Sequence, residues 1–106
     1  MINKKTYKKI KSLKSKRLRY AQERFIVEGL RLLNTILDEG AILEYVVFTK
    51  TFESKNSEFI EKINNEILFE VSEKEIKDLS NTISPSGILA VTKFPIYSKL
   101  NSNKNI

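Results

Sequence analysis

Short apolar runs alternate along the chain with segments in which apolar residues recur every three or four positions. The runs are rich in β-branched and aromatic residues, which favour strands, whereas the other spacing is typical of helices that bury one face. Ser72 and Glu75 also fit a capping box, a common start of a helix. Strands are therefore predicted at 24–27, 45–48, 67–71 and 88–91. Helices are predicted at 5–17, 28–39, 57–63 and from 73 onward.

This order of elements predicts an α/β fold in a single domain. Strands that alternate with short helices usually form a mainly parallel sheet, which here would have four strands. The strands are almost continuously apolar, which indicates that helices cover both faces of the sheet. Residues 1–24 would form a basic helix or arm and residues 25–96 the α/β body. The tail at 97–106 is rich in Asn, Ser and Lys and is predicted to be a linker or a frayed end.

The helix predicted at 5–17 is amphipathic. Ile10 and Leu13 lie three positions apart, and this narrow apolar stripe would rest on the body of the domain. A neighbouring arc of about 100° on the helical wheel is polar and mostly cationic. Its members are Lys5, Lys8, Lys9, Ser12, Lys16 and Arg19.

Positive charge is concentrated at the start of the chain. The first 24 positions contain ten of the nineteen Lys and Arg residues and a single acid, so this arm carries +9. The remaining positions hold nine bases and twelve acids and carry −3. Cations gathered in one segment favour a polyanionic partner, because phosphate binding needs positive charge on one surface. The alternative is a solubilising or disordered lysine tail.

The composition excludes several kinds of site. The chain has no Cys and no His, which removes disulfides, thiolate metal sites and histidine bases. Its three glycines stand apart, so it lacks the glycine-rich loops that hold nucleotides. No apolar run approaches the roughly 18 residues of a membrane span, and no signal-peptide core follows the basic start. We therefore expect a cytoplasmic protein without membrane contact, and no catalytic, metal or cofactor residues in this region.

Some residues fit either a structural or a functional role. Glu28 lies at a strand-to-helix corner, where an acid can act chemically, but the helix N-terminus also stabilises a carboxylate and the structural role is favoured. Gly29 is expected to mark a close backbone approach. The segment 84–87 either presents N–H groups to phosphate or forms a turn, and the turn is favoured. Tyr7 and Tyr20 either stack on unpaired bases or anchor the arm, and anchoring is favoured.

Four segments in a fixed order together resemble a known family. They are Lys9-Ile10-Lys11-Ser12-Leu13, Lys16-Arg17-Leu18-Arg19, Phe25-Ile26-Val27-Glu28-Gly29 and, far downstream, Ser84-Pro85-Ser86-Gly87-Ile88-Leu89-Ala90-Val91. The combination is similar to the N-terminal substrate-binding domain of the SpoU (TrmH) family of RNA 2′-O-ribose methyltransferases. The resemblance covers roughly residues 8–95 and departs from the family pattern at Ser86.

The resemblance implies a three-layer α/β/α sandwich like that of a small ribosomal protein that binds kinked RNA. It also implies a second, knotted domain beyond the linker at 97–106, which binds S-adenosylmethionine, catalyses methyl transfer and forms a homodimer. Basic residues at positions that match the family motifs are expected to bind RNA phosphates. The concentration of positive charge adds two further lysines, Lys5 and Lys8. The expected RNA-binding residues are Lys5, Lys8, Lys9, Ser12, Lys16, Arg17 and Arg19.

We therefore expect the RNA-recognition domain of an S-adenosylmethionine-dependent ribose methyltransferase, with ribosomal RNA favoured over transfer RNA. A first alternative is a free-standing RNA-binding protein of the ribosome or of another RNA–protein particle, without enzymatic activity. A second alternative is a protein-interaction module that uses the arm as a docking helix. An open reading frame that continues into a glycine-bearing domain would eliminate the first alternative.

Overall fold

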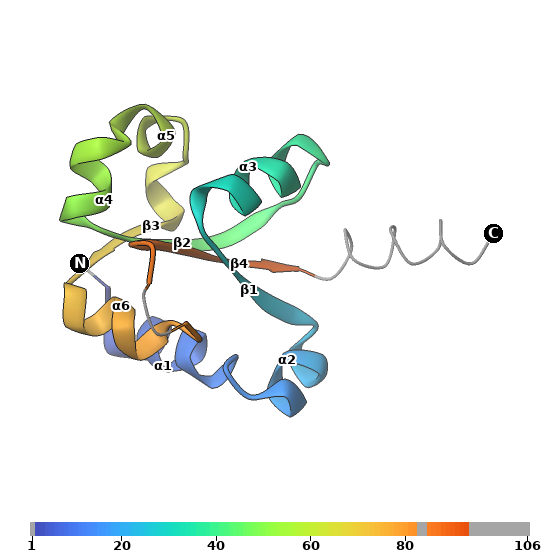
Figure 1. The fold of residues 1–106 in the computed structure, drawn as a ribbon. Helices are drawn as coiled ribbons and strands as arrows, with labels where there is room; N and C mark the ends of the chain where they lie inside the picture. Colours follow the sequence, from blue (N-terminus) through green and yellow to red (C-terminus); the bar gives the residue numbers. More distant parts are fainter. Residues whose placement is uncertain (1, 83–84, 94–106) are drawn as a thin grey trace.

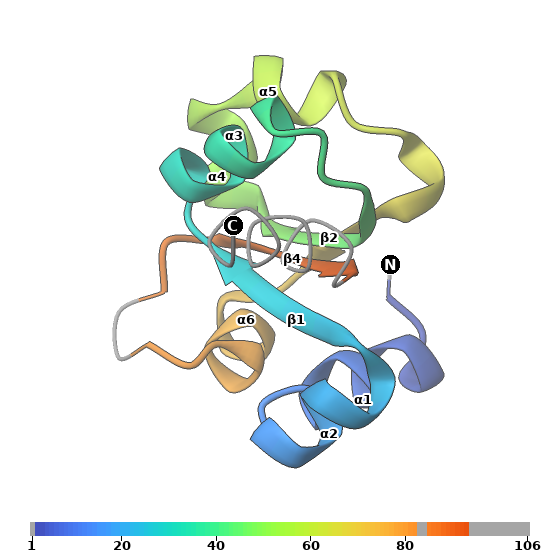
Figure 2. The ribbon, with the colours of Figure 1, turned by 90° about the vertical axis from the view of Figure 1, so that its right-hand side faces the viewer.

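A four-stranded sheet between two layers of helices makes up the computed structural model, which describes residues 2–82 and 85–93 (Figure 1). The strands are β1 (Arg24–Glu28), β2 (Leu43–Thr49), β3 (Leu68–Val71) and β4 (Ile88–Lys93). The helices are α1 (Lys4–Ser12), α2 (Lys16–Gln22), α3 (Leu30–Asp38), α4 (Lys50–Lys55), α5 (Ser57–Glu61), the 3-10 helix η1 (Asn65–Ile67) and α6 (Glu73–Leu79). Figures 1 and 2 show α3, α4 and α5 on one face of the sheet and α1, α2 and α6 on the other. The predicted α/β fold with both faces covered is therefore observed.

The prediction of a mainly parallel sheet is wrong. The strand order is β1-β4-β2-β3, and β4 runs antiparallel to both neighbours, so among the described strands only β2 and β3 pair in parallel. The path of α6 explains this. The seven-residue helix leads from the end of β3 to the end of β1, where Ser80 bonds Glu28. The chain then enters the sheet at the edge where β1 and β2 end, and β4 must run the opposite way.

Each face of the sheet has its own apolar core. Leu33 and Phe52 belong to the core beneath α3, α4 and α5, whereas the core on the other face includes Ile10 and Leu13 of the arm. The first four side chains of β4, at 88–91, alternate between the two cores and are fully buried. Its members in the first core are Ile88 and Ala90, and those in the second are Leu89 and Val91. Burial on both sides explains why this strand is continuously apolar.

The single helix predicted at 5–17 is wrong, because two helices take its place. Ser12 Oγ donates a hydrogen bond to the carbonyl oxygen of Lys9 at 2.7 Å, and α1 ends at this serine. Ser15 Oγ then accepts a hydrogen bond from the backbone N–H of Leu18 at 3.4 Å and caps α2. Serine side chains that bond nearby backbone groups compete with a continuous helix. The arc of basic residues predicted on one wheel therefore does not continue from α1 into α2.

Two features of the connections bear on the predictions. The polar stretch after β2 contains a helix, α4, which Thr49 caps by accepting a hydrogen bond from the N–H of Phe52 at 3.2 Å. One buried apolar residue in six positions produces no periodicity, so the pattern missed this helix.

The capping box at Ser72 and Glu75 is confirmed by reciprocal hydrogen bonds of 3.0 and 2.9 Å. The predicted linker at 97–106 lies outside the described residues.

Candidate nucleic-acid interface

The apolar stripe of the arm holds α1 against the sheet, as predicted. Ile10 is 0% exposed and Leu13 is 1% exposed. Both belong to the core formed with Val47, Ile76 and Leu89. Burial of two large aliphatic side chains favours a fixed position for the helix by roughly 1.5–3 kcal/mol each. The arm is therefore a packed layer of the domain.

Asp78 of α6 adds polar contacts that fix α1. The hydroxyl of Tyr7 donates to Asp78 Oδ2 at 2.5 Å, and Lys11 Nζ lies 3.0 Å from the same oxygen. Lys14 Nζ donates to the backbone oxygen of Asp78 at 2.9 Å. The hydrogen bonds from Tyr7 and Lys11 lower the pKa of the Asp78 carboxyl. Burial, together with the bond to Asp78, raises the pKa of Tyr7 to about 12. Tyr7 thus anchors the arm, as favoured from the sequence.

Two arginines hold α2 in place. Arg19 Nη1 donates to the carbonyl oxygens of Leu13 and Lys14 at 3.1 and 3.0 Å, next to the end of α1, where helical carbonyls lack partners. Arg24 binds Glu44 through two hydrogen bonds, Nε to Oε1 at 3.1 Å and Nη2 to Oε2 at 3.3 Å. The guanidinium of Arg19, an expected phosphate ligand, therefore faces the backbone of its own chain.

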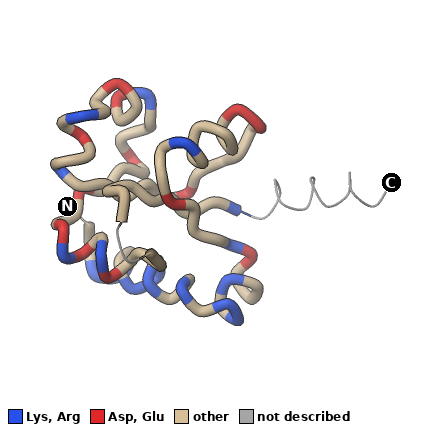
Figure 3. Tube along the Cα trace, viewed as in Figure 1, with Lys and Arg blue, Asp and Glu red and all other residues tan. Residues whose placement is uncertain are grey.

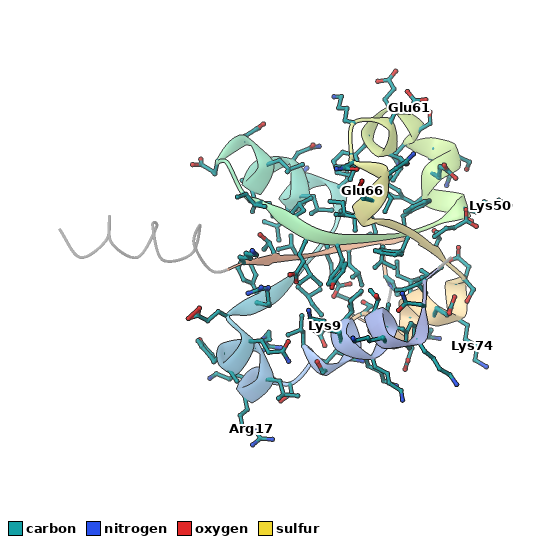
Figure 4. All side chains as sticks on the ribbon, turned by 180° about the vertical axis from the view of Figure 1, so that it is seen from behind. Lys9, Arg17, Lys50, Glu61, Glu66 and Lys74 are labelled. Carbon is teal, nitrogen blue, oxygen red and sulfur yellow. The ribbon has the colours of Figure 1, made fainter. Side chains whose placement is uncertain are left out.

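Four of the expected RNA-binding residues are exposed cations without an acidic partner among the described residues. Two project from α1 one helical turn apart, and two open α2. Figure 3 shows basic positions along both helices, and in Figure 4 Arg17 points away from the domain. The four are Lys5, Lys8, Lys16 and Arg17. Their positive charges are thus available to a polyanion.

The two other expected residues have local contacts. Lys9 is exposed, and its Nζ lies 5.7 Å from the centre of the Tyr45 ring, within the range of a cation–π interaction. Ser12 is half-buried, and its hydroxyl bonds the carbonyl of Lys9. Lys9 remains accessible to a ligand, whereas Ser12 has a capping role within α1.

The structure adds two lysines that the sequence did not point to. Lys74 and Lys77 are exposed on α6, which contacts α1. Together with Tyr7, Glu75 and Asp78 they line a hollow of about 560 Å³ between the helices. Figure 4 shows Lys74 on the same side of the sheet as Arg17. Acids and bases alternate in α6, so its charge carried no signal, and only the fold places these lysines near the arm.

The opposite layer presents acidic side chains. Exposed acids lie on α5 and η1, and Figure 4 shows Glu61 and Glu66 across the sheet from Arg17. Such a separation of charge orients a polyanion toward the layer with α1 and α2, because the far layer repels it.

Glu28 acts as a clasp between distant segments. Its Oε1 accepts a hydrogen bond from Ser80 Oγ at 2.5 Å, and its Oε2 accepts one from the N–H of Asn81 at 2.9 Å. Both carboxylate oxygens thus bind the connection between α6 and β4. This supports the structural role favoured from the sequence, although the partner is a loop and not the start of α3.

The close backbone approach expected at Gly29 occurs at Gly87 instead. A Cβ on Gly29 would come no closer than 4.0 Å to Ser86 Oγ, and the glycine is needed there for its φ of 95°. A Cβ on Gly87 would lie 3.0 Å from Thr49 Oγ1 and 3.1 Å from Phe52 Cβ. The described residues 85–87 lead into β4 with a bend at Gly87, while Ser84 lies outside the described part, so the turn favoured for 84–87 stays a prediction.

Within residues 2–82 and 85–93, no three His, Cys, Asp or Glu side chains are grouped to hold a metal ion. No helix in the described part of the chain is long and apolar enough to cross a membrane.

Fold and surface together define a small α/β domain with one cationic helical layer. The family described as MRM3-like substrate binding domain matches residues 4–90. The chain belongs to this family.

Relatives and solved structures agree with this assignment. The chain is 32% identical over 88 residues to rRNA methyltransferase 3, mitochondrial, of Xenopus laevis, which is 82% of this chain and 20% of the relative. A crystal structure of an RNA 2′-O ribose methyltransferase matches with a TM-score of 0.75 and 27% identity, over 87% of this chain and 35% of that one. The SpoU methyltransferase AviRb of Streptomyces viridochromogenes shares the fold with a TM-score of 0.70 at 14% identity, over 88% and 34%.

The chain spans about one fifth of the length of the curated relative that it matches. The resemblance to substrate-binding domains of the SpoU (TrmH) family, inferred from four motifs in order, is confirmed.

Proposed function

We propose that this chain is the RNA-gripping domain of an S-adenosylmethionine-dependent RNA 2′-O-ribose methyltransferase that acts on ribosomal RNA. The observation that carries this function is the set of exposed cations on α1 and α2, Lys16 and Arg17 among them, that have no acidic partner within the described residues. The name of the Xenopus relative, an rRNA methyltransferase, supports ribosomal RNA as the substrate.

The domain supplies affinity and register for a catalytic domain elsewhere in the protein. Cations on α1 and α2 bind phosphates, which position the RNA but read little of its sequence. Selectivity comes from RNA shape and from bases that are not paired. Held in this way, one ribose is presented to the catalytic domain.

We assign methyl transfer to a second domain, which would bind S-adenosylmethionine and form the homodimer. A solved neighbour, described as an AdoMet-bound rRNA methyltransferase from Sinorhizobium meliloti, shares the fold of this chain at 22% identity. The isolated glycines of this region offer no glycine-rich nucleotide loop. A cytoplasmic location stays a prediction, since the Xenopus relative is named mitochondrial.

Salt dependence of RNA binding tests the grip. If about five phosphates are neutralised, log K should fall with log salt at a slope of about −3.5 to −4.5. Fluorescence anisotropy of a labelled structured RNA at several salt concentrations measures this slope. An affinity that does not respond to salt, or no affinity for structured RNA, would refute the proposal.

A pair of charge-matched variants locates the grip. Replacing Lys16 and Arg17 by Ala should make the slope shallower by about 1.4–1.8, since two phosphate contacts are lost. Replacing Lys55 and Lys62, exposed on the opposite layer, removes the same charge and should leave the slope unchanged. Equal effects of both pairs would show that only net charge matters and not this surface.

The alternatives give different results. A free-standing RNA-binding protein would bind RNA with the same slope, so the length of the open reading frame past residue 106 separates it from a methyltransferase domain. A protein-interaction module would melt at a higher temperature with a protein partner and show no response to RNA.

A further inference from the structure

We infer that α2 carries a stacking site for one unpaired nucleotide, formed by Tyr20 between Lys16 and Arg17. The ring would stack on a base that has left the helix of the RNA, and the two cations would hold the neighbouring phosphates. The inference rests on the proposed function, since it takes RNA as the partner.

The exposure of Tyr20 is the first observation. Its side chain is 55% exposed, whereas the other tyrosine of the arm, Tyr7, is half-buried and fixed to Asp78. Leu32 and Ile42 are the other large apolar side chains that are exposed among the described residues, and both lie outside the arm. A contact that anchors the arm, the role favoured from the sequence, still leaves more than half of this side chain exposed. Tyr20 therefore offers ring surface to a ligand within the cationic layer.

The position of Tyr20 on α2 is the second observation. Residues three and four apart on a helix share a face, so Tyr20 lies on the face of Arg17 and Lys16. The exposure of the side chains supports a shared outer face, because positions 16, 17 and 20 are exposed while 18, 19 and 22 are half-buried. Helical side chains lean toward the N-terminus, so the ring lies over the turn that holds the two cations.

The rigidity of α2 is the third observation. Ser15 caps its start, Arg19 ties it to the end of α1, and Arg24 beyond its end is bound to Glu44 on β2. A ring on a fixed helix loses little freedom when a base stacks on it, so more of the contact energy is retained as affinity.

The chemistry of the site selects a class of RNA. Every base has a π-face, so stacking on a tyrosine tolerates any sequence, but a paired base inside a duplex cannot reach the ring. Flanking cations bind phosphates on either side of the stacked nucleotide. The site therefore fits a loop or a bulge in a folded RNA and not a continuous duplex.

A pair of RNAs tests the site: a hairpin with one bulged 2-aminopurine, and the same hairpin without the bulge. Tyr20→Ala should weaken binding to the bulged RNA by about tenfold and binding to the continuous hairpin by less than about twofold. Tyr20→Phe keeps the ring and should bind both RNAs like the wild type. Ile42→Ala, an exposed apolar position outside the arm, is the matched control and should change neither affinity. The fluorescence of 2-aminopurine should change on binding of the wild type and not of Tyr20→Ala.

The outcomes separate this inference from the proposed function. If Tyr20→Ala lost affinity equally for the two RNAs, or lost none for the bulged RNA, the stacking site would be overturned. Salt-dependent binding of the wild type would still support RNA binding by the arm. Absence of wild-type binding to both RNAs would overturn the grip itself and the stacking site with it. If Tyr20→Ala melts at a lower temperature than the wild type, Tyr20→Leu takes its place in the binding test, because leucine keeps apolar bulk but has no ring. A stacking site then predicts the same selective loss on the bulged RNA for Tyr20→Leu.

Discussion

Glu28 joins two parts of the domain that lie 52 residues apart in sequence, and its removal is a sharp test of the contact between β1 and the connection from α6 to β4. Glu28→Ala deletes both acceptors of the clasp between β1 and the connection from α6 to β4. Ser80 is 4% exposed, so its hydroxyl cannot turn to water, although Thr82 remains a partner at 2.9 Å. Asn81 is exposed, and water can replace its lost bond.

The magnitude follows from these two bonds. A hydrogen bond to a charged group contributes about 1.5–3 kcal/mol, and the bond at Asn81 is partly replaced by water, so we expect Glu28→Ala to lose about 2–4 kcal/mol. Glu28→Gln retains one carbonyl acceptor but turns an NH2 toward the other donor, so a loss of about 1–2 kcal/mol is expected. For a domain of this size each kcal/mol lowers Tm by roughly 4–8 °C. Glu28→Ala should therefore lower Tm by about 10 °C or more.

Thermal and urea unfolding followed by circular dichroism measure this loss. Glu61→Ala is the matched control, because it removes the same charge from an exposed position on α5. A Tm for Glu28→Ala within about 2 °C of that of the wild type would refute the clasp. It would also reopen a chemical role for this carboxylate.

The remaining predictions concern the arm. Glu23 ends α2 at φ 55°, where a side chain with a Cβ costs about 1–2 kcal/mol. Glu23→Gly should therefore raise Tm by several degrees, whereas Glu23→Ala, which keeps the Cβ, should not. The pKa of Tyr7 is raised from 10.0 to about 12 in the folded state, so its contribution to stability is complete below pH 10 and lost as the pH rises toward 12. With Tyr7→Phe, the free energy of unfolding measured in urea should depend less on pH between 10 and 12. An unchanged pH dependence would contradict the contact with Asp78.

Most elements of the fold could be predicted because each depends on a local pattern. The capping box at Ser72 and Glu75 and the apolar runs of the strands are such patterns, and all four predicted strands are present. The direction of β4 is not local. It depends on where α6 ends, which a contact between Ser80 and Glu28 determines, and no periodicity records that contact. The break between α1 and α2 was missed for a different reason, since serines are tolerated within helices as well as at their ends.

In the candidate site, too, features of one continuous segment could be predicted, whereas features that depend on distant contacts could not. Concentrated charge located the arm, because that property belongs to one continuous segment. The sequence could not tell which cations face outward, since Lys11 and Lys14 are drawn to Asp78 of α6 and Arg19 to carbonyls at the end of α1. Lys74 was missed because it enters the same layer from a segment without excess positive charge.

If the arm binds RNA as proposed, the cations that hold it in place should raise the affinity of the remaining cations for phosphate. A flexible lysine tail would lose conformational freedom on each phosphate contact, whereas α1 and α2 are already ordered by buried Ile10 and by the contacts of Arg19. Asp78 illustrates the balance, because its carboxylate subtracts one positive charge from the layer and yet fixes Tyr7 and Lys11. Net charge and preorganisation therefore oppose each other at this residue. A surface that keeps such an acid among its cations relies on their fixed positions as well as on their number.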